Sequence, residues 1–240
     1  MSKLQLPAVT LICADCVDPD RAIHSLEKCT ALCDFGAVKL LTSKPTYYPH
    51  RVECRHLGSI NEYSAFCLKD IYKFVDTSHM LIVQHDGWIL NPKSWNNSWL
   101  SYDYIGPLFQ QHEFVFAHSV GSGGFSLRSR RLMEYVSTHL PPWDGVHSFD
   151  QKTGNSWGHE DGVICHYMRY HILQAGFVFG TPEDAAWFGY TRGCLPEKYK
   201  HLDAFGFHGH WPELLPQGVS SELVLSAVDK MREARRANQS

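Results

Sequence analysis

Three polar residues, Gln84, His85 and Asp86, directly follow the apolar run Met80–Val83. Four consecutive apolar residues rich in branched side chains predict a strand that is buried on both faces, as in the middle of a parallel or mixed sheet. The polar residues then stand at the carboxyl end of this strand, where open α/β sheets place their ligands. From these residues alone, Asp86 beside a histidine either holds a divalent cation or caps the following turn.

Two adjacent carboxylates, Glu160 and Asp161, precede an apolar segment that runs from Gly162 to about Ala175. This segment is expected to be helical, so both carboxylates stand at its amino end, where the helix dipole favours negative charge. A carboxylate there either caps the helix or acts as a general base towards a substrate hydroxyl. The pattern is not the zinc-binding His-Glu-x-x-His motif, because position 163 is valine.

A glycine-rich segment covers residues 120–128, with Gly121, Gly123 and Gly124 within four positions. Glycine permits positive φ and lets a ligand approach the backbone closely. The segment therefore predicts either a tight turn before a helix over residues 129–140 or one wall of a binding site. It is neither a P-loop nor a G-x-G-x-x-G fingerprint, because the required residues do not follow.

Two further candidates lie near the ends of the chain. Ala14 and Asp15 follow the apolar run Val9–Cys13, which predicts a short buried strand. Asp15 either binds a ribose or base, or caps the following turn. His208 lies in the segment Phe205–Trp211, where glycines and aromatic residues alternate, and this context makes the histidine a ligand candidate.

The elements that must position these groups follow a β-α-β pattern, which predicts a parallel sheet. Residues 9–13 and 37–42 predict strands on either side of a helix over residues 21–33, and a helix over residues 61–76 leads into the strand before Gln84. The remaining expected elements are a tryptophan-rich helix around Trp95 and Trp99, short strands near 51–56 and 177–179, and helices over 182–187 and 220–236. We expect one folded body over residues 1–216 and a C-terminal helix or tail over 217–240.

The composition is that of a soluble globular protein, with 44% hydrophobic and 20% charged residues. A net charge of -3 gives no overall attraction to nucleic acid or to an anionic membrane. No signal peptide is recognisable and no apolar run reaches the roughly 18 residues of a membrane span. We therefore expect a cytoplasmic protein with reduced, buried cysteines. The weaker alternative for the cysteines is a zinc site formed by Cys13, Cys16, Cys29 and Cys33.

In their order along the chain, these landmarks resemble those of nucleotide-sugar glycosyltransferases with the GT-A fold. Five segments are similar to an uncharacterised glycosyltransferase-like family of that fold: QHDGWILNPKSW, YDYIGPLF, VGSGGFSLRSRRL, HEDGVICHYMR and FGFHGHW. The similarity spans roughly residues 8–211. It implies a single Rossmann-related α/β domain with a mixed, mostly parallel central sheet flanked by helices.

The resemblance also implies roles for individual residues. Asp86 matches the last acid of a D-x-D corner, which joins Mn²⁺ or Mg²⁺ to the donor diphosphate, and His208 matches the histidine that completes the metal site. Asp161, with Glu160, matches the catalytic motif in which the aspartate acts as the base. The positions implied to bind the donor are Ala14, Asp15, His85, Asp86, Gly123 and Gly124. One departure is that Gln84 stands where the first acid of D-x-D is expected, so the corner offers a single carboxylate.

The implied activity is transfer of a hexose or pentose from a nucleoside-diphosphate sugar, in the first instance a UDP-sugar, to an acceptor hydroxyl. A glycan is the ordinary acceptor, and a hydroxymethylated pyrimidine in DNA is the alternative. If the acceptor is DNA, a basic cluster would contact its phosphates. This cluster is formed by Arg128, Arg130, Arg131, Arg232, Arg235 and Arg236. Because the first acid is missing, a non-catalytic module that binds nucleotide sugars or carbohydrates stays open. The donor sugar, the stereochemistry and the oligomeric state are not specified by the sequence.

Overall fold

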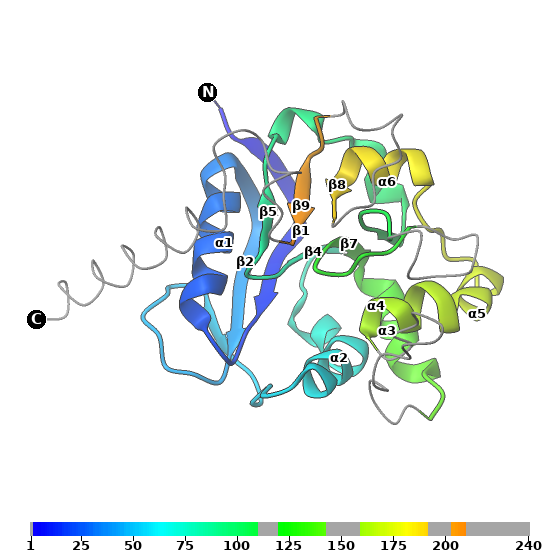
Figure 1. The fold of residues 1–240 in the computed structure, drawn as a ribbon, viewed down its shortest axis with the longest axis horizontal. Coiled ribbons are helices and arrows are strands. Elements are labelled where there is room, and N and C mark those ends of the chain that lie inside the picture. Colours follow the sequence, from blue (N-terminus) through cyan, green and yellow to red (C-terminus); the bar gives the residue numbers. More distant parts are fainter. Residues whose placement is uncertain (1, 110–119, 143–158, 192–202, 210–240) are drawn as a thin grey trace, which may run out of the picture.

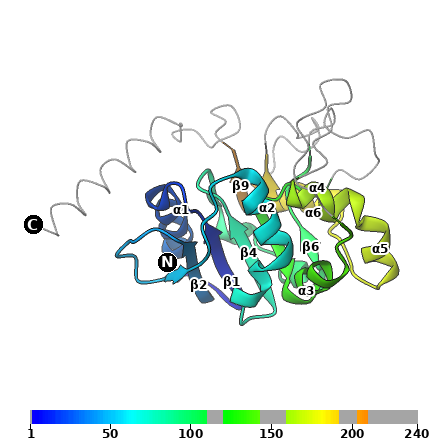
Figure 2. The same ribbon diagram turned by 90° about the horizontal axis from the view of Figure 1, so that it is seen from below.

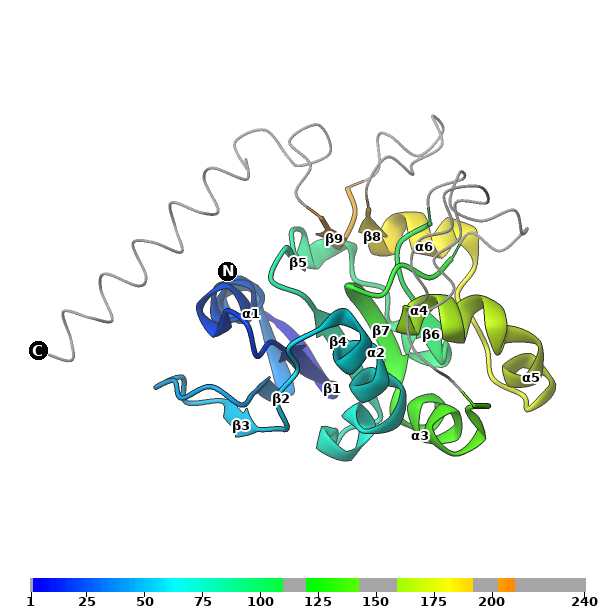
Figure 3. The ribbon, with the colours of Figure 1, turned by 60° about the horizontal axis from the view of Figure 1, so that its bottom comes forward.

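A computed structural model describes residues 2–109, 120–142, 159–191 and 203–209. Within them, six strands form one sheet in the order β3-β2-β1-β4-β7-β6 (Figure 3). Several predicted features lie outside the described residues: the C-terminal helix over 220–236 with Arg232, Arg235 and Arg236, and Cys194 and Trp211.

The central sheet is mixed and mostly parallel, as predicted. Four strands run parallel: β1 (Leu4–Ala14), β2 (Cys33–Thr42), β3 (Arg51–Glu53) and β4 (His79–Val83). The strand β7 (Phe125–Ser129) pairs antiparallel with β4 and with β6 (Tyr104–Ile105). Helix α1 (Pro19–Leu32) connects β1 to β2, which confirms the β-α-β start of the chain.

Side chains of the central strands alternate between two hydrophobic cores, one on each face of the sheet. In β4, Leu81 and Val83 face the core beneath α1, while Met80 and Ile82 face the core beneath α2 (Ile60–Lys69) and α3 (Arg130–His139). Figures 1 and 2 show α1 apart from the α2–α3 layer. The period-two alternation of a strand explains why an all-apolar run was required here, because both faces are covered.

A second, three-stranded sheet places His208 beside the residue that follows Asp86. It has the order β5-β9-β8, from β5 (Gly87–Ile89), β9 (Gly206–His208) and β8 (Gly189–Tyr190). The strand β5 begins directly after Asp86, and Gly87 pairs with His208 in the antiparallel β5–β9 ladder. Helix α6 (Pro182–Phe188) precedes β8 and confirms the helix predicted there.

Some elements differ from the sequence prediction. The strand β7 was not predicted, because residues 125–128 were assigned to the turn and Ser129 to the start of the helix over 129–140. The helix predicted over 61–76 ends at Lys69 and is followed by a separate 3-10 helix, Ile71–Phe74. The tryptophan-rich segment forms two short 3-10 helices, Pro92–Ser94 and Asn97–Ser101, rather than one α-helix.

The helix after Asp161 is built from three pieces. It begins with α4 (Glu160–Gly162), widens into a π-helical turn over Val163–Tyr167, and ends with α5 (Arg169–Gln174). The strand predicted over 177–179 contributes only a single bridge, between Phe179 and Tyr104. In the part of the chain that the structure covers, no helix combines the length and apolar character needed to cross a bilayer.

Candidate active site

The corner Gln84–Asp86 lies between the two sheets. The backbone N–H of Gln84 donates to the carbonyl of Gly124 at 2.8 Å, so the β4–β7 pairing extends into the glycine-rich segment. The carbonyl of His85 accepts from Ser25 Oγ at 3.0 Å, and that of Asp86 accepts from the Gly209 N–H at 2.9 Å. The corner is therefore held by its backbone, which leaves its side chains to form the site.

The His208 imidazole gathers three side chains around it. Its Nε2 lies 3.4 Å from Asp86 Oδ1 and 3.1 Å from Gln84 Oε1, and its Nδ1 lies 3.3 Å from Ser122 Oγ. Burial lowers the pKa of His208, but the hydrogen bond and charge of Asp86, together with more distant carboxylates, outweigh it and leave this pKa raised. The structure thus brings together Asp86 and His208, which are more than a hundred positions apart.

A divalent cation fits these residues if a bound phosphate supplies further ligands. Within the described ranges, no group of three or more His, Cys, Asp or Glu side chains is arranged to hold a metal ion. Asp86 and His208 do offer a carboxylate and an imidazole 3.4 Å apart, with the Gln84 amide oxygen beside them. Neighbouring ligands of one Mg²⁺ are about 3 Å apart, and Mg²⁺ commonly takes only one or two carboxylates together with substrate phosphates.

Asp161 points at the glycine-rich segment. Its Oδ2 accepts from the Gly123 N–H at 2.9 Å, and its Oδ1 accepts from the Gly162 N–H at 2.8 Å. Burial, followed by the neighbouring Glu160 charge, raises the pKa of Asp161 to about 6. A partly exposed carboxylate with a pKa near neutrality has the properties of a general base.

Glu160 has a different environment from its neighbour. Its Oε1 accepts from Arg128 at 2.9 Å, and the two side chains are 4% and 0% exposed. Arg128 also donates to the carbonyl of Gly123 at 3.3 Å and lies 5.1 Å from the Tyr104 ring. This buried ion pair therefore connects the start of α4 to the glycine-rich segment.

The burial of Arg128 corrects one sequence expectation. We placed Arg128 in a basic cluster that would contact DNA phosphates, but a fully buried guanidinium paired with Glu160 cannot do so. Arg131 is engaged as well, because it makes two hydrogen bonds of 2.6–2.7 Å to Asp103. The cluster was wrong for Arg128 because this residue belongs to β7, an unpredicted strand in the interior of the sheet whose five residues are all buried.

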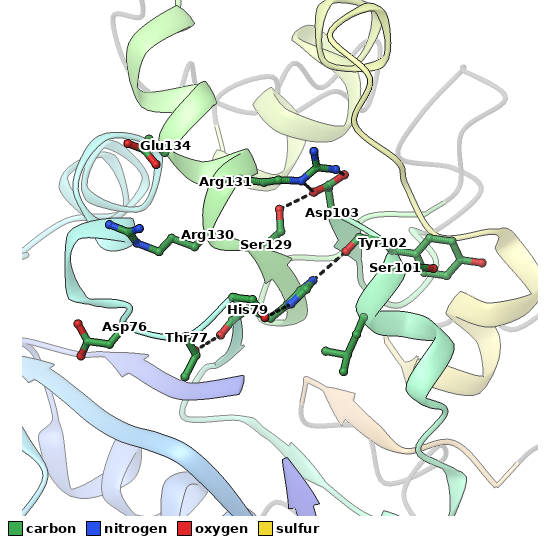
Figure 4. A pocket seen from close by; sticks show the side chains of 12 residues that line it. Asp76, Thr77, His79, Ser101, Tyr102, Asp103, Ser129, Arg130, Arg131 and Glu134 are labelled. Atoms are coloured by element: carbon green, nitrogen blue, oxygen red, sulfur yellow. Dashed lines mark hydrogen bonds and ion pairs between the residues drawn. The ribbon is translucent and has the colours of Figure 1, made fainter. Parts of the chain in front are cut away.

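Arg130 and Arg131 line a separate hollow of about 520 Å³ at the opposite end of β4 from Gln84 (Figure 4). Asp103 fills its inner wall and accepts from Ser129 Oγ at 2.6 Å as well as from Arg131. The hydrogen-bonding capacity of Asp103 is thereby used within the fold.

Gly123 and Gly124 allow the close packing of the site. A Cβ atom added at Gly124 would lie 2.1 Å from His208 Nε2. One added at Gly123 would lie 2.6 Å from Glu160 Oε1 and 2.9 Å from Asp161 Cβ. Any side chain at either position would displace a candidate functional group, which explains the density of glycine better than a simple turn does.

A cavity of about 330 Å³ adjoins the corner at the carboxyl ends of β1 and β4. Three predicted donor-binding residues, Ala14, Asp15 and His85, line it together with Gln84. The Asp15 carboxylate accepts from the N–H groups of Val17 and Asp18 at 2.7 and 2.8 Å, so Asp15 does cap the turn after β1. The remaining walls are mainly apolar and are formed by Cys16, Val17, Leu57, Gly58, Ser59, Ile60 and Tyr63.

Two residues of this region were missed from the sequence. Tyr63 lines the cavity, and its hydroxyl accepts from the Gln84 amide at 3.1 Å. Gln84 thus joins Tyr63 to His208, because its oxygen faces the imidazole. Ser122 is the second missed residue, since its hydroxyl contacts His208. No local sequence signal marks either residue, because their partners come from distant segments.

Residues 48–208, about two thirds of the chain, match a family described as "Protein of unknown function (DUF5672)". No curated protein sequence matches the chain.

Several solved structures are similar in arrangement. The mannosyltransferase PcManGT from Pyrobaculum calidifontis, in complex with GDP-Man and Mn²⁺, is 13% identical, with 77% of this chain and 58% of that chain covered and a TM-score of 0.43. The glycosyltransferase GlyE from Streptococcus pneumoniae TIGR4 is 11% identical, with 95% and 60% covered and a TM-score of 0.47. The bifunctional IspDF from Campylobacter jejuni is 11% identical, with 57% and 45% covered and a TM-score of 0.40. This chain thus spans less than two thirds of the length of these three proteins.

Proposed function

The chain belongs to the DUF5672 family of proteins of unknown function, and we propose that it is a glycosyltransferase that uses a nucleoside-diphosphate sugar. The observation that carries this proposal is the meeting of four features at one edge of the sheet. They are the Asp86–His208 pair, the glycine-rich segment, the Asp161 carboxylate with a raised pKa, and the adjoining cavity.

In the proposed arrangement the nucleoside occupies the cavity lined by Ala14, Asp15 and His85. Its apolar walls suit a base and its polar rim suits a ribose, and a UDP-sugar is our first choice of donor. The diphosphate then lies towards Asp86 and His208. Departure of the nucleoside diphosphate builds negative charge on phosphate oxygens. Without a bound cation, a protonated His208 imidazole would help to offset this charge, because the pKa of His208 is raised. A bound cation would instead take the neutral imidazole as its ligand.

We assign the general base to Asp161. The acceptor oxygen attacks the anomeric carbon, the bond from that carbon to the phosphate oxygen breaks, and the hydroxyl proton passes to the Asp161 carboxylate. Glu160 is less suited to this step, because its carboxylate is buried against Arg128. We propose instead that Glu160 positions the motif and helps to raise the pKa of Asp161.

Mn²⁺ or Mg²⁺ is the proposed cofactor, held by Asp86 and His208. A bound cation would supply further positive charge to the leaving diphosphate. The acceptor is proposed to be a glycan. A hydroxymethylated pyrimidine in DNA is a weaker candidate, because the described arginines offer less exposed charge than the sequence suggested.

The test is a thermal-shift panel of nucleoside diphosphates and their sugars, with and without Mn²⁺, because a ligand that binds only the folded state raises its stability. A shift with one nucleotide class and donor turnover in the wild-type protein support the proposal. Asp161→Asn should keep the shift and lose turnover, and full turnover in this variant would remove the base assignment. Binding without turnover under every condition would indicate the alternative, a non-catalytic nucleotide-sugar-binding module.

A further inference from the structure

Two cysteines from different loops meet at the wall of the cavity. Cys16 lies in the turn after β1, and Cys54 directly follows β3. Their Sγ atoms are 3.8 Å apart, and the residues are 1% and 9% exposed. Cys16 itself lines the cavity, so the pair is adjacent to the proposed nucleoside site.

The two thiols have different environments. Burial raises the pKa of Cys16, but hydrogen bonds outweigh this effect and leave the pKa lowered. The largest of these come from Ser43, whose N–H donates to Cys16 Sγ at 3.3 Å. Burial, followed by the Cys16 charge, raises the pKa of Cys54 to about 12.

This difference separates Cys16 from the other thiols. All seven described cysteines are unbridged and buried, and the other six have raised pKa values. Because the thiolate is the reactive form, this environment favours reaction at Cys16, and Cys54 is the sulfur in contact with it.

We propose that Cys16 and Cys54 are a site of reversible oxidative modification, at which a peroxide-class oxidant converts the two thiols into a disulfide that reshapes the cavity. The Cys16 thiolate attacks one oxygen of hydrogen peroxide, the O–O bond breaks, and a sulfenic acid and hydroxide form. Cys54 then loses its proton and attacks the Cys16 sulfur, which releases a second hydroxide. With the two thiol protons counted, two thiols and one peroxide give one disulfide and two waters.

Formation of this bond requires the turn after β1 and the segment after β3 to approach each other. A disulfide is about 2.05 Å long, so the two sulfur atoms must approach by roughly 1.8 Å. Cys16 lies in a turn whose backbone is tied to the Asp15 carboxylate through the N–H groups of Val17 and Asp18. The turn should therefore move as a unit. Asp15, Cys16 and Val17 all line the cavity, so its shape changes when the turn moves.

Formation of the disulfide does not depend on the proposed function. The expected effect of the disulfide on nucleotide binding does rest on the proposed function. The first experiment treats the full chain with hydrogen peroxide, blocks the remaining thiols, and maps disulfides by mass spectrometry without reduction. We expect a crosslinked peptide pair containing Cys16 and Cys54, with a mass about 2 Da below that of the two thiol peptides, and its disappearance with dithiothreitol. Cys54→Ser should give no crosslink and should instead leave a sulfenic acid on Cys16 that dimedone traps. No crosslink, or a crosslink through another pair, would overturn the proposal.

The second experiment measures the consequence for the cavity, with UDP as the probe. The rise in melting temperature that UDP causes should be at least halved in the oxidised wild-type protein, and it should be restored by dithiothreitol. An unchanged shift in fully crosslinked protein overturns the coupling to the cavity. If reduced protein shows no shift with any nucleotide, the proposed function fails, and hydrogen exchange at residues 14–17 becomes the readout. Faster or slower exchange there on oxidation supports the coupling, and identical exchange overturns it.

Discussion

Replacing Glu160 by glutamine should destabilise the protein strongly, because it leaves the Arg128 charge buried without its main partner. The Arg128 side chain is 0% exposed, and its guanidinium forms an ion pair with the Glu160 carboxylate at 2.9 Å. Removal of one partner from a buried pair costs about 3–5 kcal/mol. Asp161 partly compensates, because loss of the Glu160 charge lowers its pKa and keeps it ionised near Arg128. We therefore expect the lower end of this range, about 3 kcal/mol.

This loss corresponds to a fall in melting temperature of about 6–12 °C for a protein of this size. Urea unfolding with linear extrapolation measures the free energy directly. Glu134→Gln is the matched control, because Glu134 is exposed on α3 and its substitution should change stability by less than about 0.5 kcal/mol.

A double variant separates the charge from the packing. Arg128→Met combined with Glu160→Leu removes both charges, and buried pairs replaced in this way are often neutral or more stable. The Gly123 carbonyl keeps its bond from Ser126 Oγ at 2.8 Å, so it is not left without a partner. We expect the double variant to recover at least about 2 kcal/mol relative to Glu160→Gln. If Glu160→Gln is as stable as Glu134→Gln, the reasoning about the buried pair is refuted.

The pKa of Asp161 is raised from 3.8 to about 6 on folding, so this group favours the folded state at low pH and the contribution is lost as pH rises through about 6. The free energy of unfolding of Asp161→Asn, measured by urea titration relative to that of the wild type, should therefore increase as the pH is raised from about 4 to 7. A difference in unfolding free energy that does not change with pH would contradict the raised pKa of Asp161. Gln84→Glu adds a second carboxylate beside His208 and should tighten Mn²⁺ binding by about tenfold in calorimetry. Equal Mn²⁺ affinity in this variant and the wild type would contradict a metal site at Gln84–Asp86. Gly124→Ala should abolish the thermal shift caused by nucleotides, because the added methyl group displaces the His208 ring. Gly176→Ala is the control: the space around Gly176 is open but its φ is 83°, so this variant should lose about 1 kcal/mol of stability and keep the nucleotide-induced shift.

Local patterns in the sequence were sufficient for the framework of the fold. The apolar run before Gln84 predicted the doubly buried strand β4, and the alternation of strand and helix predicted the parallel start of the sheet. The strand β7 was missed because the neighbouring glycines favoured a turn over the short apolar–polar alternation of residues 125–128. Its three polar members are buried all the same, because each has a hydrogen-bond partner. Ser126 and Arg128 bond to each other and to the glycine-rich segment, and Ser129 bonds to Asp103.

The sequence by itself determined which groups of the candidate site exist and at which strand or helix ends they lie. Asp86, Asp161 and His208 were named from such local context. Only the tertiary structure decided their partners: the bridge of Gln84 from Tyr63 to His208, the burial of Arg128, and the contact between Cys16 and Cys54. The physical reason is that periodicity and capping depend on neighbours within one turn or strand, whereas burial and side-chain pairing depend on segments that meet only when the sheet is assembled.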